Sequence, residues 1–289
     1  MITSRSKIWE EICVVNNAKF EFRYVGKNND IPILVANDYL KFPDKVQDFF
    51  VKGDWWDNQC KADIRPGKSY LIHHDLVEWF SEPFARSIAP LLGLKYLRTD
   101  VAFGNNFNGN MPLYNIKSAF PHIDIVGSAA VGTEDQYANV SHIAFNINIT
   151  QSEYPVSTGF YSFNGMKSFL DFSWNTKNEE NKFFDDLGHQ EGDQLSWFQI
   201  DDYGPWVLED RVDMVYNSLV AYPTHFFHSP YIKKDWFTDT DRVTISAFLN
   251  TMPDNLDFTQ KDLDDVSYAW EFFQLDRIHG FHPKRTIPI

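Results

Sequence analysis

The chain has 289 residues, of which 43% are hydrophobic and 17% aromatic. This composition excludes a disordered chain, because it provides enough apolar surface for a substantial core. The formal net charge of −14 disfavours partners with a dense negative charge, such as nucleic acid and anionic membranes.

The cysteines and the first residues indicate a compartment. Cys13 and Cys60 form neither a CxxC motif nor a disulfide framework. The first ten residues lack the apolar segment of a signal peptide, and no stretch reaches the ~20 apolar residues that a membrane-spanning helix needs. We therefore expect a cytoplasmic protein in a reducing environment.

The first third of the chain, residues 1–94, predicts a supporting layer of mixed α and β structure. In residues 19–25, Phe20, Phe22 and Tyr24 share one face, which is typical of a half-buried strand. The other elements expected here are a strand (31–35), a helix that begins at Pro43 (43–51), a turn (65–68) and a longer helix interrupted near Pro83 (76–92).

Strands dominate from about residue 95. The clearest is 140–150, where one set of side chains (Ile143, Phe145, Ile147, Ile149) alternates with another (His142, Ala144, Asn146, Asn148). Further strands are expected at 96–103, 159–163, 194–200, 211–216, 218–222 and 242–249. Many short strands separated by turns predict a sandwich or barrel, and hence an α+β, mainly β fold.

The chain contains no Gly/Ser-rich or Pro-rich linker, which favours one domain over residues 1–289. Its core is expected at about 95–250, followed by an acidic C-terminal extension at 251–289 in which 258–273 is partly helical in pattern. The polar stretch 171–189 is expected to be a surface insertion or a short helix.

A candidate metal site begins at His122-Ile123-Asp124. Side chains two apart on a strand point to the same side, so His122 and Asp124 can bind one ion. Together with an imidazole from a distant strand they form a ligand set that holds Fe(II) on one face and leaves its other positions open. The same residue types suit Zn, Mn or Co, and a single His-x-Asp arises often by chance.

Two histidines compete for the third ligand position. His225 and His228 are three residues apart, so on a strand they would face opposite ways. His142 lies on the polar side of an alternating strand, where a hydrogen-bonded histidine that binds no metal is more common. The remaining rivals are weaker: His189, and the pair His73 and His74, which we expect at the surface or as helix caps.

A candidate anion site follows on the strand 242–249. Arg242, Thr244 and Ser246 share one face, while Val243, Ile245 and Ala247 share the other. A buried polar face is costly unless its groups are paired, and a bound carboxylate would pair with the arginine fork. The alternative is an ion pair between this arginine and Asp239 or Asp241.

These residues resemble the 2-oxoglutarate- and Fe(II)-dependent oxygenases, in particular a prolyl-hydroxylase-like and less characterised bacterial and phage branch. Four patterns carry the resemblance over residues 95–250: Tyr114 upstream of His122-Ile123-Asp124, Thr158-Gly159-Phe160-Tyr161, Pro223 five residues before His228, and Arg242-x-Thr244. In the family the distal ligand follows the proline by five residues, which selects His228 over His225.

The resemblance implies a double-stranded β-helix core of the jelly-roll or cupin type with supporting N-terminal helices. It implies that His122, Asp124 and His228 bind Fe(II). It also implies that Arg242 holds the distal carboxylate of 2-oxoglutarate, with further co-substrate contacts from Tyr114, Thr244 and Ser246. The reaction would consume O2 and release succinate and CO2.

The chain departs from the family pattern in one respect, and two rival functions remain open. The separation between Asp124 and His228 is longer than in compact members, which implies an insertion at 165–210. The retained Asp124 favours hydroxylation over halogenation. A non-catalytic cupin-like binding protein and a Zn-dependent hydrolase with the same ligands are the rival functions. The substrate, whether a small molecule, an amino acid or a peptide side chain, stays open, as does a homodimer.

Overall fold

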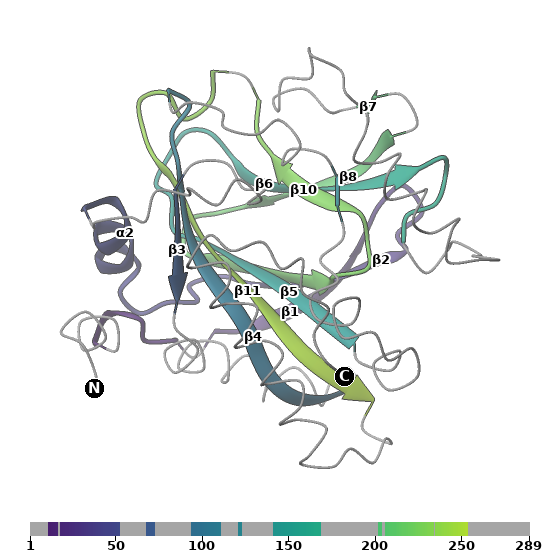
Figure 1. Ribbon diagram of the computed structural model, residues 1–289, viewed down its shortest axis with the longest axis horizontal. Coiled ribbons are helices and arrows are strands. Elements are labelled where there is room, and N and C mark those ends of the chain that lie inside the picture. Colours follow the sequence, from purple (N-terminus) through teal and green to yellow (C-terminus); the bar gives the residue numbers. More distant parts are fainter. Residues whose placement is uncertain are drawn as a thin grey trace, which may run out of the picture.

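The computed structural model describes residues 11–16, 18–52, 68–72, 94–110, 121–122, 141–168, 202–203, 206–233 and 235–253. These form eleven strands and the helix α2 (Figure 1). The elements are β1 (Phe20–Val25), β2 (Ile31–Ala36), α2 (Pro43–Lys52), β3 (Lys68–Ile72), β4 (Leu94–Phe107), β5 (Ser141–Asn148), β6 (Val156–Phe163), β7 (Asp202–Tyr203), β8 (Trp206–Met214), β9 (Ser218–Pro223), β10 (His228–Tyr231) and β11 (Arg242–Pro253).

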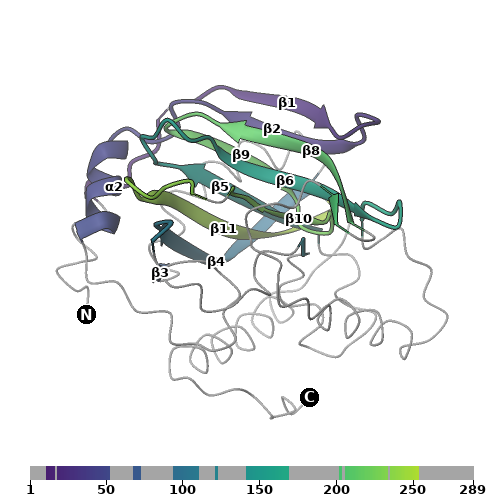
Figure 2. The ribbon, with the colours of Figure 1, turned by 90° about the horizontal axis from the view of Figure 1, so that it is seen from above.

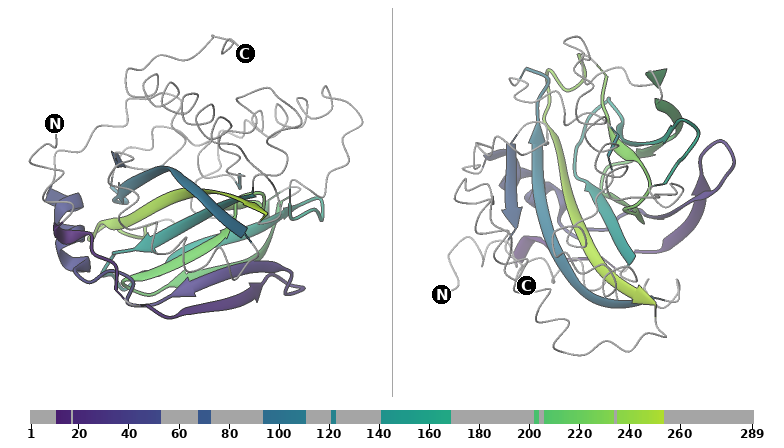
Figure 3. Two further views of the ribbon diagram at one scale, coloured as in Figure 1. Left: turned by 90° about the horizontal axis from the view of Figure 1, so that it is seen from below. Right: turned by 45° about the vertical axis from the view of Figure 1, so that its right-hand side comes forward.

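The described strands make two sheets in which all pairs are antiparallel. The large sheet has the order β1-β2-β9-β5-β11-β4-β3, and the small sheet has the order β10-β6-β8-β7. In the large sheet β4 and β11 run side by side over most of their length (Figure 3), with register shifts between Phe248 and Leu249 and between Asn250 and Thr251. The two sheets lie one over the other (Figure 2). Because the described elements are eleven strands and the helix α2, the architecture is mainly β.

Side chains of both sheets fill the space between them. Phe160 of β6 and Met214 of β8 are buried against Ala144, Tyr222 and Phe248 of the large sheet. We call the face of the large sheet that carries these residues its inner face. Burial of such apolar side chains stabilises the pairing of the two sheets by roughly 1.5–3 kcal/mol per fully buried residue.

The opposite, outer face of the large sheet is covered by α2. Pro43 occupies the first turn, where its missing N–H costs nothing, and Val46 and Phe50 are four residues apart, so both point to the sheet. They are fully buried in one cluster with Ile147 and Ile245. Phe50 fits because β4 has Gly104 beneath it: a Cβ there would lie 1.9 Å from Phe50 Cε1.

Most predicted elements with described residues are confirmed. The helix expected at 43–51 is α2, and the strands expected at 31–35, 159–163, 218–222 and 242–249 are β2, β6, β9 and the first part of β11. The alternation expected in 140–150 is confirmed for Ile143, Phe145, Ile147 and Ile149, which all lie in the outer cluster. β3 and β10 were not predicted, because both are short and lack an alternating pattern.

Two predictions need correction. The aromatic face of β1 is not half-buried: the exposed fraction is 45% for Phe22 and 55% for Tyr24, because the cover over this sheet face ends near Phe20. Strand β8 starts at Trp206 and ends before Tyr216, so the end of the insertion expected at 165–210 belongs to the sheet. The predicted elements at 76–92, 171–189, 194–200 and 258–273 lie outside the described residues, as does most of the turn at 65–68.

Candidate functional site

The two histidines predicted as metal ligands lie side by side. His122 and His228 form an isolated antiparallel bridge in which each backbone N–H donates to the carbonyl of the other, at 2.9 Å in both directions. Their ring centroids are 4.8 Å apart with an angle of 52° between the ring planes. Residues 106 positions apart in the sequence are thus held at the separation that two ligands of one ion require.

The environment of His228 fixes its ring. The exposed fraction of this residue is 3%, and its Nδ1 lies 2.9 Å from the carbonyl oxygen of Phe226. A carbonyl only accepts, so Nδ1 carries the proton and Nε2 presents a lone pair in the neutral ring. The ring of Tyr222 packs edge-on against that of His228 at 4.7 Å. This arrangement of a metal-binding imidazole, oriented through its other nitrogen, is common in metal sites.

Arg242 is a buried cation without an anionic partner in the described part of the chain. Its exposed fraction is 6%, Nε has no hydrogen-bond partner, and NH1 makes one long contact of 3.5 Å with Thr244 Oγ1. Burial lowers the pKa of the guanidinium from its ordinary value to about 10, and the electrostatic interaction with Tyr222 offsets a part of that shift. A buried guanidinium is costly unless an anion pairs with it, so the site is suited to a carboxylate.

The alternative ion pair for Arg242 is not observed. Asp241 instead accepts hydrogen bonds from Asn106 Nδ2 at 3.2 Å and Asn108 Nδ2 at 3.0 Å, and no salt bridge joins Arg242 to Asp239 or Asp241. The prediction that Arg242 and Thr244 share a buried face is confirmed.

A hydrogen-bonded chain of polar side chains crosses the inner face of the large sheet. Asn105 Nδ2 donates to Ser246 Oγ at 3.1 Å, Ser246 Oγ donates to Asn146 Oδ1 at 2.6 Å, and Asn146 Nδ2 donates to the Tyr222 hydroxyl at 2.9 Å. This series of hydrogen bonds ends at Tyr222. The ring of Tyr222 contacts that of His228, and Tyr222 interacts electrostatically with Arg242. Tyr222 therefore interacts both with His228, through its ring, and with Arg242, electrostatically.

Sequence reasoning missed Tyr222 as a site residue. It was placed only as the last residue of an apolar strand, where an aromatic side chain suggests core packing. The available signal was strand parity: within 218–222 the even-numbered positions face the same side, and Tyr222 is the polar-tipped member immediately before Pro223.

The other predicted residues fall into two groups. Asp124 and Tyr114 lie outside the described residues, as do His73, His74 and His189. His225 lies in the turn between β9 and β10 with its ring beside Phe226, so the argument that it faces away on a strand was wrong, although it does not join the His122–His228 pair. Within the described ranges, no three side chains of the His, Cys, Asp or Glu type gather into a metal site.

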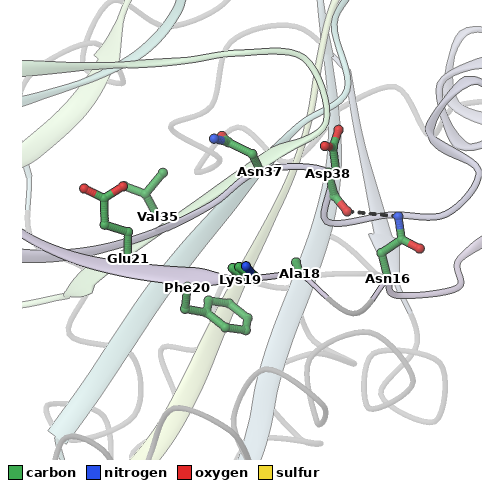
Figure 4. A pocket seen from close by; sticks show the side chains of 8 residues that line it. All are labelled: Asn16, Ala18, Lys19, Phe20, Glu21, Val35, Asn37 and Asp38. Atoms are coloured by element: carbon green, nitrogen blue, oxygen red, sulfur yellow. Dashed lines mark hydrogen bonds between the residues drawn. The ribbon is translucent and has the colours of Figure 1, made fainter.

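A separate hollow lies along β1 and β2 and is lined mainly by polar side chains (Figure 4). Its volume is about 560 Å³, and it contains no imidazole; its lining consists of Asn16, Ala18, Lys19, Phe20, Glu21, Val35, Asn37 and Asp38. This hollow therefore contains neither the imidazole pair nor the buried arginine that define the candidate site. No helix in the described part of the chain is long and apolar enough to cross a membrane.

No protein family model and no curated protein matches the chain. Among solved structures, HygX from Streptomyces hygroscopicus with nickel and 2-oxoglutarate bound is similar at a TM-score of 0.41 and 12% identity, over 80% of this chain and 89% of that chain. AviO1 from Streptomyces viridochromogenes Tue57 is similar at a TM-score of 0.36 and 11% identity, over 90% of this chain and 99% of that chain. Because these identities and TM-scores are low, a proposal for the function rests on the residues of the chain itself.

Proposed function

We propose that the protein is an Fe(II)- and 2-oxoglutarate-dependent dioxygenase with a jelly-roll core, which hydroxylates a C–H bond of a small molecule, an amino acid or a peptide side chain. The observation that carries the proposal is the buried Arg242, whose Nε has no partner and which makes no ion pair with any described residue. An arginine fork of this kind binds a carboxylate through two parallel hydrogen bonds.

The imidazole pair fits the metal. His122 and His228 would hold Fe(II) through one nitrogen each, and Asp124, two residues after His122, would supply the carboxylate. When bound, the metal supplies the oxidative chemistry that couples O2 and 2-oxoglutarate to substrate hydroxylation, with succinate and CO2 as products. The Phe226 carbonyl keeps His228 in the tautomer that can bind a metal through Nε2, because it accepts a hydrogen bond from the protonated Nδ1.

The buried arginine supports this function better than the rivals. A Zn-dependent hydrolase with the same three ligands does not by itself account for a buried arginine that has no anionic partner among the described residues. In the proposed enzyme, Arg242 binds the distal carboxylate of 2-oxoglutarate, and Thr244, which contacts Arg242, and Tyr222, which interacts with it electrostatically, would contribute further hydrogen bonds. Low exposure of this site excludes water and strengthens each of these interactions.

The test is a titration of the protein with Fe(II) and 2-oxoglutarate without oxygen. The proposal predicts a weak visible charge-transfer band that needs both additions. His228→Ala should lose metal binding and the band, whereas the matched variant His225→Ala should retain both. If the folded wild type shows neither the band nor 2-oxoglutarate binding, the protein is not an oxygenase of this class. If it binds 2-oxoglutarate equally well without a metal and never forms the band, a cupin-like binding protein is the better description.

A further inference from the structure

The exposed edge of the large sheet is a second feature that the proposed function does not explain. In the described part of the chain β1 pairs only with β2, so one side of its backbone is not used in the sheet (Figure 2). Four consecutive residues of β1, from Glu21 to Tyr24, are exposed. An exposed edge strand with large apolar side chains is a template for pairing with another strand.

The side chains on this edge are unusual for a free surface. Phe22 and Tyr24 are 45% and 55% exposed, and their rings pack against each other at 4.9 Å with an angle of 89°. On the opposite face of the strand, Arg23 forms hydrogen bonds of 2.7 and 2.6 Å with the Glu21 carboxylate. The edge thus presents an aromatic face and a face with both signs of charge.

We propose that β1 pairs with β1 of a second copy, antiparallel and around a twofold axis at Phe22. In this register Glu21 lies opposite Arg23 of the other copy, and the same pair occurs again by symmetry. Phe20 lies opposite Tyr24 of the other copy, and the two Phe22 side chains meet on the axis. Opposite charges and aromatic rings directly across two strands are the pairs that stabilise a sheet.

The charges of the strand select this register among the alternatives. A shift by two residues in one direction brings two Arg23 side chains together, and the shift in the other direction brings two Glu21 side chains together. A shift by one residue puts Phe22 opposite Glu21 and mixes the aromatic face with the charged face. The chain as a whole carries a charge of −14, which opposes contact between two copies, so a locally balanced strand is a favourable place for one.

Sedimentation velocity over a wide concentration range tests the interface. The wild type should dimerise reversibly. Arg23→Glu brings carboxylates together twice in the dimer, and the dissociation constant should rise by about tenfold or more. The double variant Glu21→Arg, Arg23→Glu restores both opposite-charge pairs and should restore the dimer. Lys52→Glu, an exposed charge change on α2, is the control and should leave the association unchanged.

Cross-linking tests the position of the axis independently of charge. In a Cys60→Ser background, Phe22→Cys should form an intermolecular disulfide on mild oxidation, because this residue lies opposite itself. Tyr24→Cys, which lies opposite Phe20, should not, and the native Cys13 is buried. A wild type that stays monomeric at all concentrations, or an Arg23→Glu variant that dimerises like the wild type, overturns the proposal. Thermal unfolding of each variant confirms that these exposed substitutions leave the fold intact.

Discussion

The two faces of the large sheet come from the same strands but differ in what they contain. On the outer face, Val243, Ile245 and Ala247 of β11 pack with α2 in a cluster that is apolar throughout. On the inner face, Arg242 and Thr244 are buried to a similar degree but are polar. An apolar face needs only packing, whereas a buried polar face needs partners, and among the described residues Arg242 has no anionic partner and its Nε no hydrogen-bond partner. Both faces therefore contribute apolar packing, but among these buried residues of β11 the polar ones lie on the inner face, where we propose that the ligand binds.

The largest expected effect belongs to the outer face. Phe50→Ala removes a fully buried ring that lies over Gly104, and should lower the free energy of unfolding by about 3–5 kcal/mol. Val51→Ala on the same helix changes a side chain that is 40% exposed and should cost less than about 0.5 kcal/mol. Urea unfolding measures both. Equal effects of the two substitutions would contradict the assignment of α2 as the cover of this face.

Arg242→Met should raise the free energy of unfolding in the absence of ligand, which is the opposite of the effect of Phe50→Ala. Burial lowers the folded-state pKa of Arg242 from its ordinary value to about 10, so the unfolded state binds the proton more tightly. The charge therefore destabilises the fold fully below about pH 10, by an amount on the order of 3 kcal/mol, and less as the pH rises above about 10 toward the ordinary pKa of arginine. The methionine variant should melt at a higher temperature than the ligand-free wild type. A lower melting temperature would show that the cation is already compensated.

Tyr222→Phe should have a smaller effect, limited to the inner face. The substitution keeps the ring against His228 but removes the hydroxyl that accepts from Asn146, so the free energy of unfolding should fall by about 1 kcal/mol. The affinity for 2-oxoglutarate should fall several-fold, while metal binding stays within about twofold. Calorimetry of 2-oxoglutarate binding with and without metal separates these outcomes, and a loss of metal binding alone would assign Tyr222 to the imidazoles only.

Thr244→Val should have the smallest effect. The contact between Arg242 and Thr244 is 3.5 Å long, at the outer limit of a hydrogen bond, and valine preserves the shape of threonine. The unfolding free energy should change by less than about 1 kcal/mol, and the 2-oxoglutarate affinity by a few-fold. If Thr244→Val lowered the 2-oxoglutarate affinity as much as Arg242→Met does, Thr244 rather than Arg242 would be the main contact of the anion.

The sequence predicted the parts of this molecule that depend on local periodicity. Alternation in β5 and β11 sorted the outer side chains from the inner ones, and the proline and the spacing of apolar residues predicted α2. The spacing from Pro223 in the resembled family selected His228 over His225 as the expected ligand, which stays a prediction; the structure shows that His122 and His228 form a bridge. The alternation and the helical spacing are predictable because two-residue and 3.6-residue periods are properties of single elements.

Long-range relations were not predictable in the same way. The chain from Asn105 through Ser246 and Asn146 to Tyr222 joins four strands, and no local pattern specifies which strands become neighbours. The exposure of Phe22 and Tyr24 depends on where the cover of the sheet ends, which is equally non-local. The roles of Asp124 and Tyr114 stay predictions.

Calorimetric titration of 2-oxoglutarate into the metal-loaded wild type and into Arg242→Met tests the central claim most directly. The account predicts that the wild type binds 2-oxoglutarate and that the variant, still folded and still binding metal, loses about 100-fold or more in affinity, as expected for a buried charge-assisted pair. Equal affinities of the two proteins would show that the buried arginine is not the carboxylate site.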